Sequence, residues 1–416
     1  MQDNEKKPAL RFKGFTDPWE QRKLTNLCEK FTDGDWIEAK DQSDSGVRLV
    51  QTGNVGVTEY LDKPNNKKWI SFETFEQLHC EEVYPGDILI SRLPEPAGRA
   101  CIMPNLGTKM ITAVDCTIVR PNAVTSTRFL LQYLSSQAYF DAVNTCLAGG
   151  TRQRISRGNL AQFNVPIPSS KIEQEKIGEV LEKLDTLITL HQRKYEKLVN
   201  IKKSMLDKMF PQNGASVPEI RFKGFTDPWE QRKLSDIVEK VTEKNAGLQY
   251  IETFTNSAEF GIISQRDFFD HDISKIGSLD GYYVVHNEDF VYNPRISVTA
   301  PVGPINRNKL GRTGVMSPLY TVFRPHDIDT TYLEHFFKSG YWHSFMNFNG
   351  DSGARSDRFS IKDSVFFEMP IPTPDIEEQK KIGEFLTQLD TLITLHQRKL
   401  EKLQNIKKSC LEKMFV

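Results

Sequence analysis

Two short stretches have the residue types of a metal-dependent nuclease. Glu38-Ala39-Lys40 and Glu378-Gln379-Lys380 each place a lysine two residues after a carboxylate, and such a pair can flank a metal-bound water that attacks a phosphodiester. Patterns of three residues arise by chance in a chain with 26% charged residues. The sequence has no G-x-x-x-x-G-K-[ST] loop, no H-E-x-x-H helix and no G-x-S-x-G elbow. We therefore predict no catalytic residue and no metal site in this chain.

Arginine-rich stretches are the second feature with a chemical use, because a guanidinium can read guanine edges and clamp phosphates. Residues 290–325 contain five basic residues and no acidic one. The corresponding residues 86–160 contain eight basic residues against four acidic ones. The segments GGTRQRISR (149–157) and GARSDR (353–358) add arginines beside flexible glycines. The alternative for each arginine is a solubilising surface role or an ion pair within its own domain.

Length and composition limit the classes of protein that this chain can be. It has 416 residues, 54 Lys and Arg against 55 Asp and Glu, and a formal net charge of -1. At about 100 to 200 residues per domain, two to four domains are expected. The first residues are polar and no apolar run approaches the roughly 18 residues that cross a bilayer, so we expect no signal peptide and no membrane anchor. Six cysteines without metal-ligand spacing favour reduced thiols and a cytoplasmic location. The balanced charge excludes a uniformly basic DNA coat, but not a local basic patch.

One sequence unit occurs twice in the chain. RFKGFTDPWEQRKL at residues 11–24 recurs unchanged at 221–234. Near the other end of each half, residues 177–210 and 382–415 differ at seven of 34 positions. The interiors diverge, although GDILISR still corresponds to EDFVYNPR and CTIVRP to YTVFRP. We infer one domain type used twice, with a fixed frame and a variable interior.

Helical spacing begins after PIPSS in the first half and after PIPTP in the second. From Ile177 to Met209, apolar residues recur every three or four positions, with an interruption at Lys202. This pattern is typical of a coiled-coil seam of about five heptads, and a helix over residues 172–210 would be about 55 to 60 Å long. Such a helix needs a partner, which the second copy supplies. The interiors are rich in Gly, Pro, Thr, Val, Ile and Phe and predict mixed, largely β domains. The predicted packing positions of the helices are Leu181, Leu184, Ile188, Leu198, Leu386, Leu389, Ile393 and Leu403.

Two similar domains joined by helices of fixed length would act as a ruler on DNA. If each domain enters a major groove, the helix length sets the distance between two short half-sites with an unread gap between them. Because the interiors differ, the two half-sites should differ in sequence. Because the frames are nearly identical, a partner that docks on one frame should dock twice.

The order of these motifs resembles the specificity subunit of type I restriction-modification systems. Each half has R-F-x-G-F and W-E-x-x-K-L, a variable interior, P-I-P, E-Q-x-K-I-G and L-D-x-L-I. The resemblance implies two target recognition domains, one for each half of a bipartite, gapped double-stranded DNA site. It also implies an antiparallel pair of spacer helices that binds two modification subunits, which carry S-adenosylmethionine and methylate adenine. Two restriction subunits, which use ATP and Mg²⁺, would attach to that core, and the specificity subunit itself would hold no cofactor and catalyse nothing.

The expected fold is α+β, with a pseudo-two-fold internal repeat of two largely β recognition domains and a pair of long antiparallel coiled-coil helices. Carried over by position, the recognition domains span residues 1–168 and 219–372. The spacer helices span 169–210 and 373–416, and residues 211–218 are the linker. Charge and loop chemistry select the expected DNA contacts, which are Arg92, Arg99, Arg152, Arg154, Arg295, Arg307, Arg312, Arg355 and Arg358.

Two other functions remain alternatives at this stage. A coiled-coil adaptor with two ligand-binding domains would keep the same frame but show no salt-dependent DNA affinity. A stand-alone nuclease that uses Glu38 or Glu378 would cut DNA with Mg²⁺ alone. The sequence does not specify the target bases, the gap length, the strand order, or whether DNA binding requires the partner subunits.

Overall fold

The computed structural model describes residues 7–150, 153–212, 214–269, 276–351 and 357–415. The chain forms two compact units. Unit 1 comprises Met1–Arg193 and Gln397–Val416, and unit 2 comprises Lys194–His396. Each unit therefore contains one variable interior and parts of both long helices.

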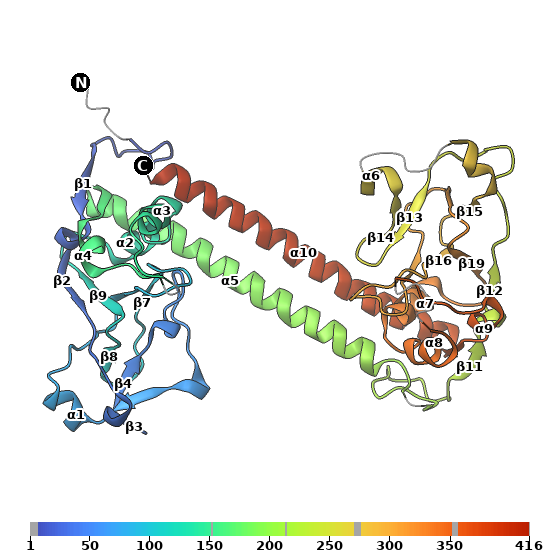
Figure 1. The fold of residues 1–416 in the computed structure, drawn as a ribbon, viewed down its shortest axis with the longest axis horizontal. Helices are drawn as coiled ribbons and strands as arrows, with labels where there is room; N and C mark the ends of the chain where they lie inside the picture. The colour runs from blue at the N-terminus through green and yellow to red at the C-terminus, as the bar shows by residue number, and fades with distance from the viewer. Residues whose placement is uncertain (1–6, 151–152, 213, 270–275, 352–356, 416) are drawn as a thin grey trace. The chain divides into compact units, whose positions relative to one another are not determined.

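The described part of unit 1 is built on two four-stranded sheets (Figure 1). The first has the antiparallel order β2-β9-β6-β7. The second has the order β3-β5-β4-β8, in which β4 and β8 run parallel, and β1 pairs separately with β10. The strands are β1 (Trp19–Lys23), β2 (Cys28–Asp33), β3 (Gln42–Ser43), β4 (Val47–Val50), β5 (Lys68–Ile70), β6 (Ile88–Ser91), β7 (Ala100–Ile102), β8 (Met110–Thr112), β9 (Cys116–Pro121) and β10 (Asn164–Pro168). The short helices are α1 (Phe72–Gln77), α2 (Thr127–Tyr133), α3 (Gln137–Thr145) and α4 (Arg157–Gln162).

Unit 2 repeats one of these sheets and replaces the other. Its four-stranded sheet has the antiparallel order β12-β19-β16-β17, and β11 pairs with β20 as β1 does with β10. Two separate pairs, β13-β14 and β15-β18, complete the β structure described for this unit. The strands are β11 (Glu230–Lys233), β12 (Val238–Lys240), β13 (Phe254–Ser257), β14 (Gly261–Ser264), β15 (Tyr283–Val285), β16 (Phe290–Tyr292), β17 (Ile305–Arg307), β18 (Gly314–Met316), β19 (Thr321–Pro325) and β20 (Pro370–Thr373). The short helices are α6 (Gln265–Phe269), α7 (Thr330–Lys338), α8 (His343–Asn349) and α9 (Asp363–Phe366).

The same ion pair braces the matching sheets of the two units. Arg120 on β9 donates to Asp87 with Nε at 2.8 Å from Oδ1, and Arg324 on β19 donates to Asp289 with the same geometry. Both aspartates are almost completely buried. The faint sequence correspondence between the interiors therefore marks one sheet that occurs in both halves.

The two long helices are α5 (Lys171–Lys208) and α10 (Ile376–Met414), close to the predicted ranges. In unit 1, Lys407 of α10 pairs with Asp185 of α5. In unit 2, Lys202 of α5 pairs with Asp390 of α10. The residue numbers rise along one helix as they fall along the other, so the pair is antiparallel. This confirms the predicted α+β fold with antiparallel coiled-coil helices.

Each long helix begins in one unit and ends in the other, where its last residues complete the hydrophobic core. In unit 1 the ring of Phe415, just after α10, lies 5.3 Å from that of Phe129 and 6.4 Å from that of Trp19. In unit 2 the ring of Phe210, just after α5, lies 5.5 Å from that of Tyr332. Phe210 is fully buried. The repeated K-M-F sequence thus closes an aromatic cluster in each unit.

A repeated glycine allows each long helix to approach the neighbouring short helix. At Gly178 of α5, a Cβ atom would lie 2.7 Å from Cβ of Arg128, closer than packed carbon atoms approach. At Gly383 of α10, a Cβ atom would lie 3.1 Å from the backbone nitrogen of Tyr332. The glycine of the E-Q-x-K-I-G motif is therefore a packing residue.

In the described part of the chain, no helix is long and apolar enough to cross a membrane.

Candidate nucleic-acid interface

The basic stretch 290–325 is neutralised by carboxylates from other segments. Arg307, Lys309, Arg312 and Arg324 each form an ion pair, and the acidic partners are Glu288, Glu334, Glu252 and Asp289. Arg295 is the fifth basic residue and is exposed. No hydrogen bond or ion pair of its side chain occurs among the described residues. The sequence asymmetry therefore reflects ion pairing within unit 2 at four of the five positions.

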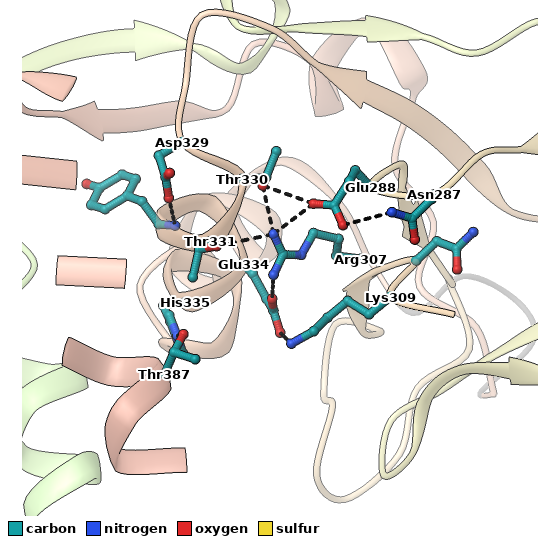
Figure 2. A network of polar contacts seen from close by, with 12 residues as sticks. Asn287, Glu288, Arg307, Lys309, Asp329, Thr330, Thr331, Glu334, His335 and Thr387 are labelled. Atoms are coloured by element: carbon teal, nitrogen blue, oxygen red, sulfur yellow. Dashed lines mark hydrogen bonds and ion pairs between the residues drawn. The ribbon is translucent and has the colours of Figure 1, made fainter. Parts of the chain in front are cut away.

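Arg307 lies at the centre of a buried polar network between β17 and α7, which Figure 2 shows from close by. Its Nη2 lies 2.6 Å from Oε2 of Glu334, and its Nη1 donates to Glu288 at 3.0 Å. The side chains of Arg307 and Glu334 are both 8% exposed. Lys338 also pairs with Glu334, at 2.7 Å, and lies 3.8 Å from Asp390 of α10. The network thus links the four-stranded sheet to the helix pair within unit 2.

The network shifts the protonation equilibria of two adjacent side chains. Burial alone would raise the pKa of Glu334. The positive charges of Lys338, Arg307 and Lys309 have the larger effect, and they lower this pKa from the ordinary 4.5 to about 2. Burial lowers the pKa of His335, and Lys338 lowers it again. His335 Nε2 lies 3.1 Å from Oγ1 of Thr387 on α10, and Figure 2 shows these two side chains next to each other. At neutral pH the pair is therefore a carboxylate beside a neutral imidazole.

Two of the arginines predicted in unit 1 are also held inside the protein. The side chain of Arg92 is 11% exposed, donates to the carbonyl of Val114 at 2.6 Å and lies 3.4 Å from Asp33. Arg99 donates to four backbone carbonyls, those of Thr52, Val55, Leu93 and Pro96. Both guanidinium groups thus brace loops of their own unit.

Three of the arginines predicted to contact DNA are accessible and have no carboxylate within hydrogen-bonding distance among the described residues. They are Arg154, Arg295 and Arg358. The side chain of Arg154 is 62% exposed, and its closest carboxylate oxygen, on Asp115, is 3.9 Å away. Arg358 is half-buried, and no polar partner of its side chain occurs among the described residues. Arg312 is exposed but binds both oxygens of Glu252, at 2.7 and 2.8 Å. Arg152 and Arg355 lie outside the described residues.

Arg295 and Arg358 are brought together in unit 2, where their backbones form an antiparallel bridge. Both line a hollow of about 390 Å³. Its polar lining includes Asn256, Asn293 and Tyr320, and its apolar lining includes the exposed Phe268 and Phe269. The side-chain amides are committed internally, since Asn293 donates to the carbonyl of Asn256, and Asn256 to that of Val291. Unlike these amides, the guanidinium groups of Arg295 and Arg358 have no hydrogen-bond acceptor among the described residues.

The E-x-K motifs do not form a nuclease site in the described structure. Glu378 is completely buried, and both its oxygens accept from Arg221. Glu38 pairs with its own neighbour Lys40 at 3.0 Å on the surface. Among the described residues, no group of three or more His, Cys, Asp or Glu side chains could hold a metal ion.

The helix positions predicted to pack differ in their degree of burial. Leu181, Leu386 and Leu389 are buried. Leu184 packs against the core of unit 1 and Leu198 against that of unit 2. Ile188, Ile393 and Leu403 are half-buried.

Four helix leucines outside the predicted packing set are exposed in matching places. In unit 1, Leu187 is 43% and Leu190 is 48% exposed. In unit 2, Leu392 is 42% and Leu395 is 45% exposed. The sequence analysis did not predict these residues as a binding surface. The sequence L-D-T-L-I-T-L-H-Q-R-K, which is identical in both copies, could have indicated them. We call Leu187, Leu190, Leu392 and Leu395 the exposed leucines.

Residues 16–200 and 226–405 each match the family described as Type I restriction modification DNA specificity domain. These two matches cover most of the chain. The chain belongs to this family. It is accordingly a type I restriction-modification specificity subunit with two specificity domains.

Two curated relatives and one solved structure are also similar to this chain. The putative type I restriction enzyme MjaX specificity subunit of Methanocaldococcus jannaschii is 22% identical over 423 residues, which cover 94% of this chain and 91% of the relative. The type I restriction enzyme MjaVIII specificity subunit of the same organism is 25% identical over 260 residues, covering 59% of this chain and 60% of that one. The fold is similar to that of the crystallised type I restriction-modification S subunit from M. genitalium, with a TM-score of 0.59, 12% identity and 99% of each chain covered.

Proposed function

We propose that each unit of this specificity subunit reads one half of a bipartite, gapped double-stranded DNA site in the major groove. The observation that carries the proposal is the repeated sheet, β2-β9-β6-β7 and β12-β19-β16-β17, with different loops attached to it in the two units. A common scaffold with different loops suits two related reading surfaces that recognise different sequences. Exposed arginines in both units supply donors for phosphates and for guanine edges.

The paired helices α5 and α10 would set the separation of the half-sites. A helix rises about 1.5 Å per residue, so its length is a fixed spacer as long as the pair stays packed. Ion pairs and apolar contacts hold the helices together in each unit. The exposed leucines would provide two equivalent docking places for modification subunits, because matched apolar patches on a helix surface indicate partners.

The chemistry would belong to the partner subunits. Two modification subunits would bring S-adenosylmethionine and methylate adenine, and two restriction subunits would bring ATP and Mg²⁺. This chain would contribute recognition without catalysis. The burial of Glu378 against Arg221 argues against the stand-alone nuclease, and the family argues against a general adaptor.

Sequencing of methylated adenines tests this proposal directly. The chain is produced with its modification partner, and the methylated motif is compared with that of a chimera in which residues 24–166 also replace residues 234–370. We expect the original chain to methylate one gapped motif with two different halves. The chimera should methylate a gapped inverted repeat of the first half alone. Absence of methylation, retention of the second half by the chimera, or DNA cleavage by the chain alone would contradict the proposal.

A further inference from the structure

Arg154 occupies a defined position beside the end of one strand of the repeated sheet in unit 1. The residue after it, Ile155, is completely buried. The backbone nitrogen of Ile155 donates to the carbonyl oxygen of Arg92 at 3.2 Å, and Arg92 directly follows β6. This bond and the buried side chain fix the segment, so that Arg154 projects beside the end of β6.

Arg358 has the same position in unit 2. The residue after it, Phe359, is 7% exposed, and its backbone nitrogen donates to the carbonyl oxygen of Pro294 at 2.7 Å. Pro294 lies just beyond β16, which takes the place of β6 in the matching sheet. Arg154 and Arg358 are therefore structurally equivalent, although the sequences around them differ.

Arg295 has no equivalent arginine in unit 1. It follows Pro294, whereas the residue that follows Arg92 is Leu93. An arginine at the position of Arg295 thus occurs in unit 2 alone, because unit 1 has Leu93 there and its Arg92, one position earlier, is held inside the protein. The arginine of the neighbouring segment occurs in both units. Under the proposed function, the units read different bases on the same kind of phosphate backbone.

The bridge between Arg295 and Arg358 places two like charges opposite each other. Directly opposed residues of an antiparallel pair have Cβ atoms about 4.5 to 5.5 Å apart, and like charges in this arrangement destabilise the fold. No carboxylate among the described residues pairs with either side chain. Local arrangements that cost stability without a compensating contact are expected at functional sites. An anionic ligand such as DNA would supply a counter-charge to both guanidinium groups.

We propose that Arg154 and Arg358 bind backbone phosphates in their respective half-sites, and that Arg295 reads a guanine in the half-site of unit 2. The division of roles rests on the proposed function. A residue that is retained in two units with different targets suits the contact that all sequences share, which is the phosphate. A residue present in one unit suits a base contact, and guanine is the base whose O6 and N7 accept from one guanidinium.

The two roles predict different outcomes for the same chemical change. A phosphate contact adds about 0.9 to the magnitude of the slope of log K against log salt concentration, and its loss weakens binding to all sequences equally. A guanine contact discriminates against other bases by about tenfold to hundredfold, so its loss relaxes one position of the motif.

The test uses the complex of this chain with its modification subunits and three variants, Arg154→Gln, Arg358→Gln and Arg295→Gln. DNA affinity is measured at several salt concentrations, and the methylated motif is determined by sequencing. Arg22→Gln is the matched control, because Arg22 lies on β1 and pairs with Glu20 at 2.6 Å. The control should leave both the salt slope and the motif unchanged.

Arg154→Gln and Arg358→Gln should each reduce the magnitude of the slope of log K against log salt concentration by about 0.9, the contribution of one phosphate contact. Both variants should leave the methylated motif unchanged. Arg295→Gln should relax one guanine position in the second half of the motif and leave the first half intact. A changed motif in Arg154→Gln or Arg358→Gln, or an unchanged motif in Arg295→Gln, would overturn the inference. If the original complex gives no gapped motif, the proposed function itself fails, so the two failures are distinguishable.

Discussion

Arg221 donates from Nε and Nη2 to the two carboxylate oxygens of Glu378, each at 2.8 Å, at the junction of the unit 2 frame and α10. The side chain of Glu378 is completely buried and that of Arg221 is 15% exposed. Arg11 and Glu173 form the same two-pronged pair in unit 1. The repeated R-F-K-G-F segment is thus fixed to the start of a long helix by a buried ion pair in both units.

Removal of one partner of this pair should destabilise unit 2. In Glu378→Gln, Arg221 keeps its charge but loses the carboxylate, and breaking a buried pair in this way costs about 3 kcal/mol or more. We expect a lower midpoint of urea unfolding, with little change for the control Lys380→Gln, whose side chain is exposed. If Glu378→Gln instead kept full stability and abolished a Mg²⁺-dependent cleavage of DNA, the nuclease alternative would be restored.

Local patterns in the sequence predicted the helices and the repeat with good accuracy. The predicted helix over residues 172–210 corresponds to Lys171–Lys208, because apolar periodicity is a property of consecutive residues. The matching sheets were visible as aligned strand sequences for a related reason. In a chain with an internal repeat, alignment of the two copies indicates which segments have the same structural role, even where their side chains differ.

The contacts of the arginines were less predictable, because their partners come from distant segments. Arg312 binds Glu252, which lies 60 residues earlier in the chain, and Arg307 binds Glu334 on a different element. A count of charges within residues 290–325 cannot include these carboxylates. Antiparallel pairing likewise joins Lys202 to Asp390, which explains the polar residue that interrupts the apolar seam.

A pH dependence of stability follows from His335. Burial lowers its pKa in the folded state from the ordinary 6.5, and Lys338 lowers it further, so the unfolded chain takes up a proton first. The stabilisation from the neutral imidazole is therefore complete above about pH 6.5 and declines as the pH falls below that value. Gln132 occupies the equivalent position in unit 1. The variant His335→Gln should therefore have an unfolding midpoint that changes less between pH 6.5 and pH 5 than that of the original chain. An equally steep decline in the variant would contradict this assignment.

Acidification should also reveal Glu334 in a lower pH range. Its folded-state pKa is lowered from 4.5 to about 2, so its stabilising contribution is present above pH 4.5 and is lost as the pH falls towards 2. Glu334→Gln should reduce stability at neutral pH and remove part of the acid-induced loss below pH 4.5. Leu131 occupies this place in unit 1, so Glu334→Leu with Arg307→Leu is the apolar control. A Glu334→Gln variant that unfolds in acid as the original chain does would contradict the prediction.

The opposed charges of Arg295 and Arg358 should lower the stability of unit 2 in the absence of DNA. Neutralising either residue should therefore raise Tm by about 1 to 2 °C at low ionic strength, since such a pair costs roughly 0.5 kcal/mol. Screening by salt should remove the gain near 1 M. Differential scanning fluorimetry at both salt concentrations measures the effect. A lower Tm in both variants would mean that the guanidinium groups have structural partners.

Under the proposed function, the exposed leucines form two independent docking places for modification subunits. Leu187→Ser with Leu190→Ser, or Leu392→Ser with Leu395→Ser, should each reduce the number of bound modification subunits from two to one, because half-exposed side chains contribute little to the core. Mass photometry of the assembled complex counts the subunits. Val199→Ser is a control, since Val199 is 38% exposed on α5 and lies outside the repeated leucine sequence. Loss of both subunits after either double substitution would show that the two places do not act separately.

Under the proposed function, lengthening both helices by one heptad should widen the gap between the two half-sites. Seven residues add about 10.5 Å of helix, and about 3.4 Å of duplex corresponds to one base pair, so the gap should grow by about three base pairs. The insertions belong at the matching H-Q-R sequences, His191 to Arg193 and His396 to Arg398, where they preserve the seven-residue repeat of the seam. The methylated motif should keep both half-sites and change in spacing alone. An insertion in α5 but not in α10 is the control, because it shifts the paired seams out of register and should abolish methylation. An unchanged gap after the double insertion would show that the helices do not set the spacing.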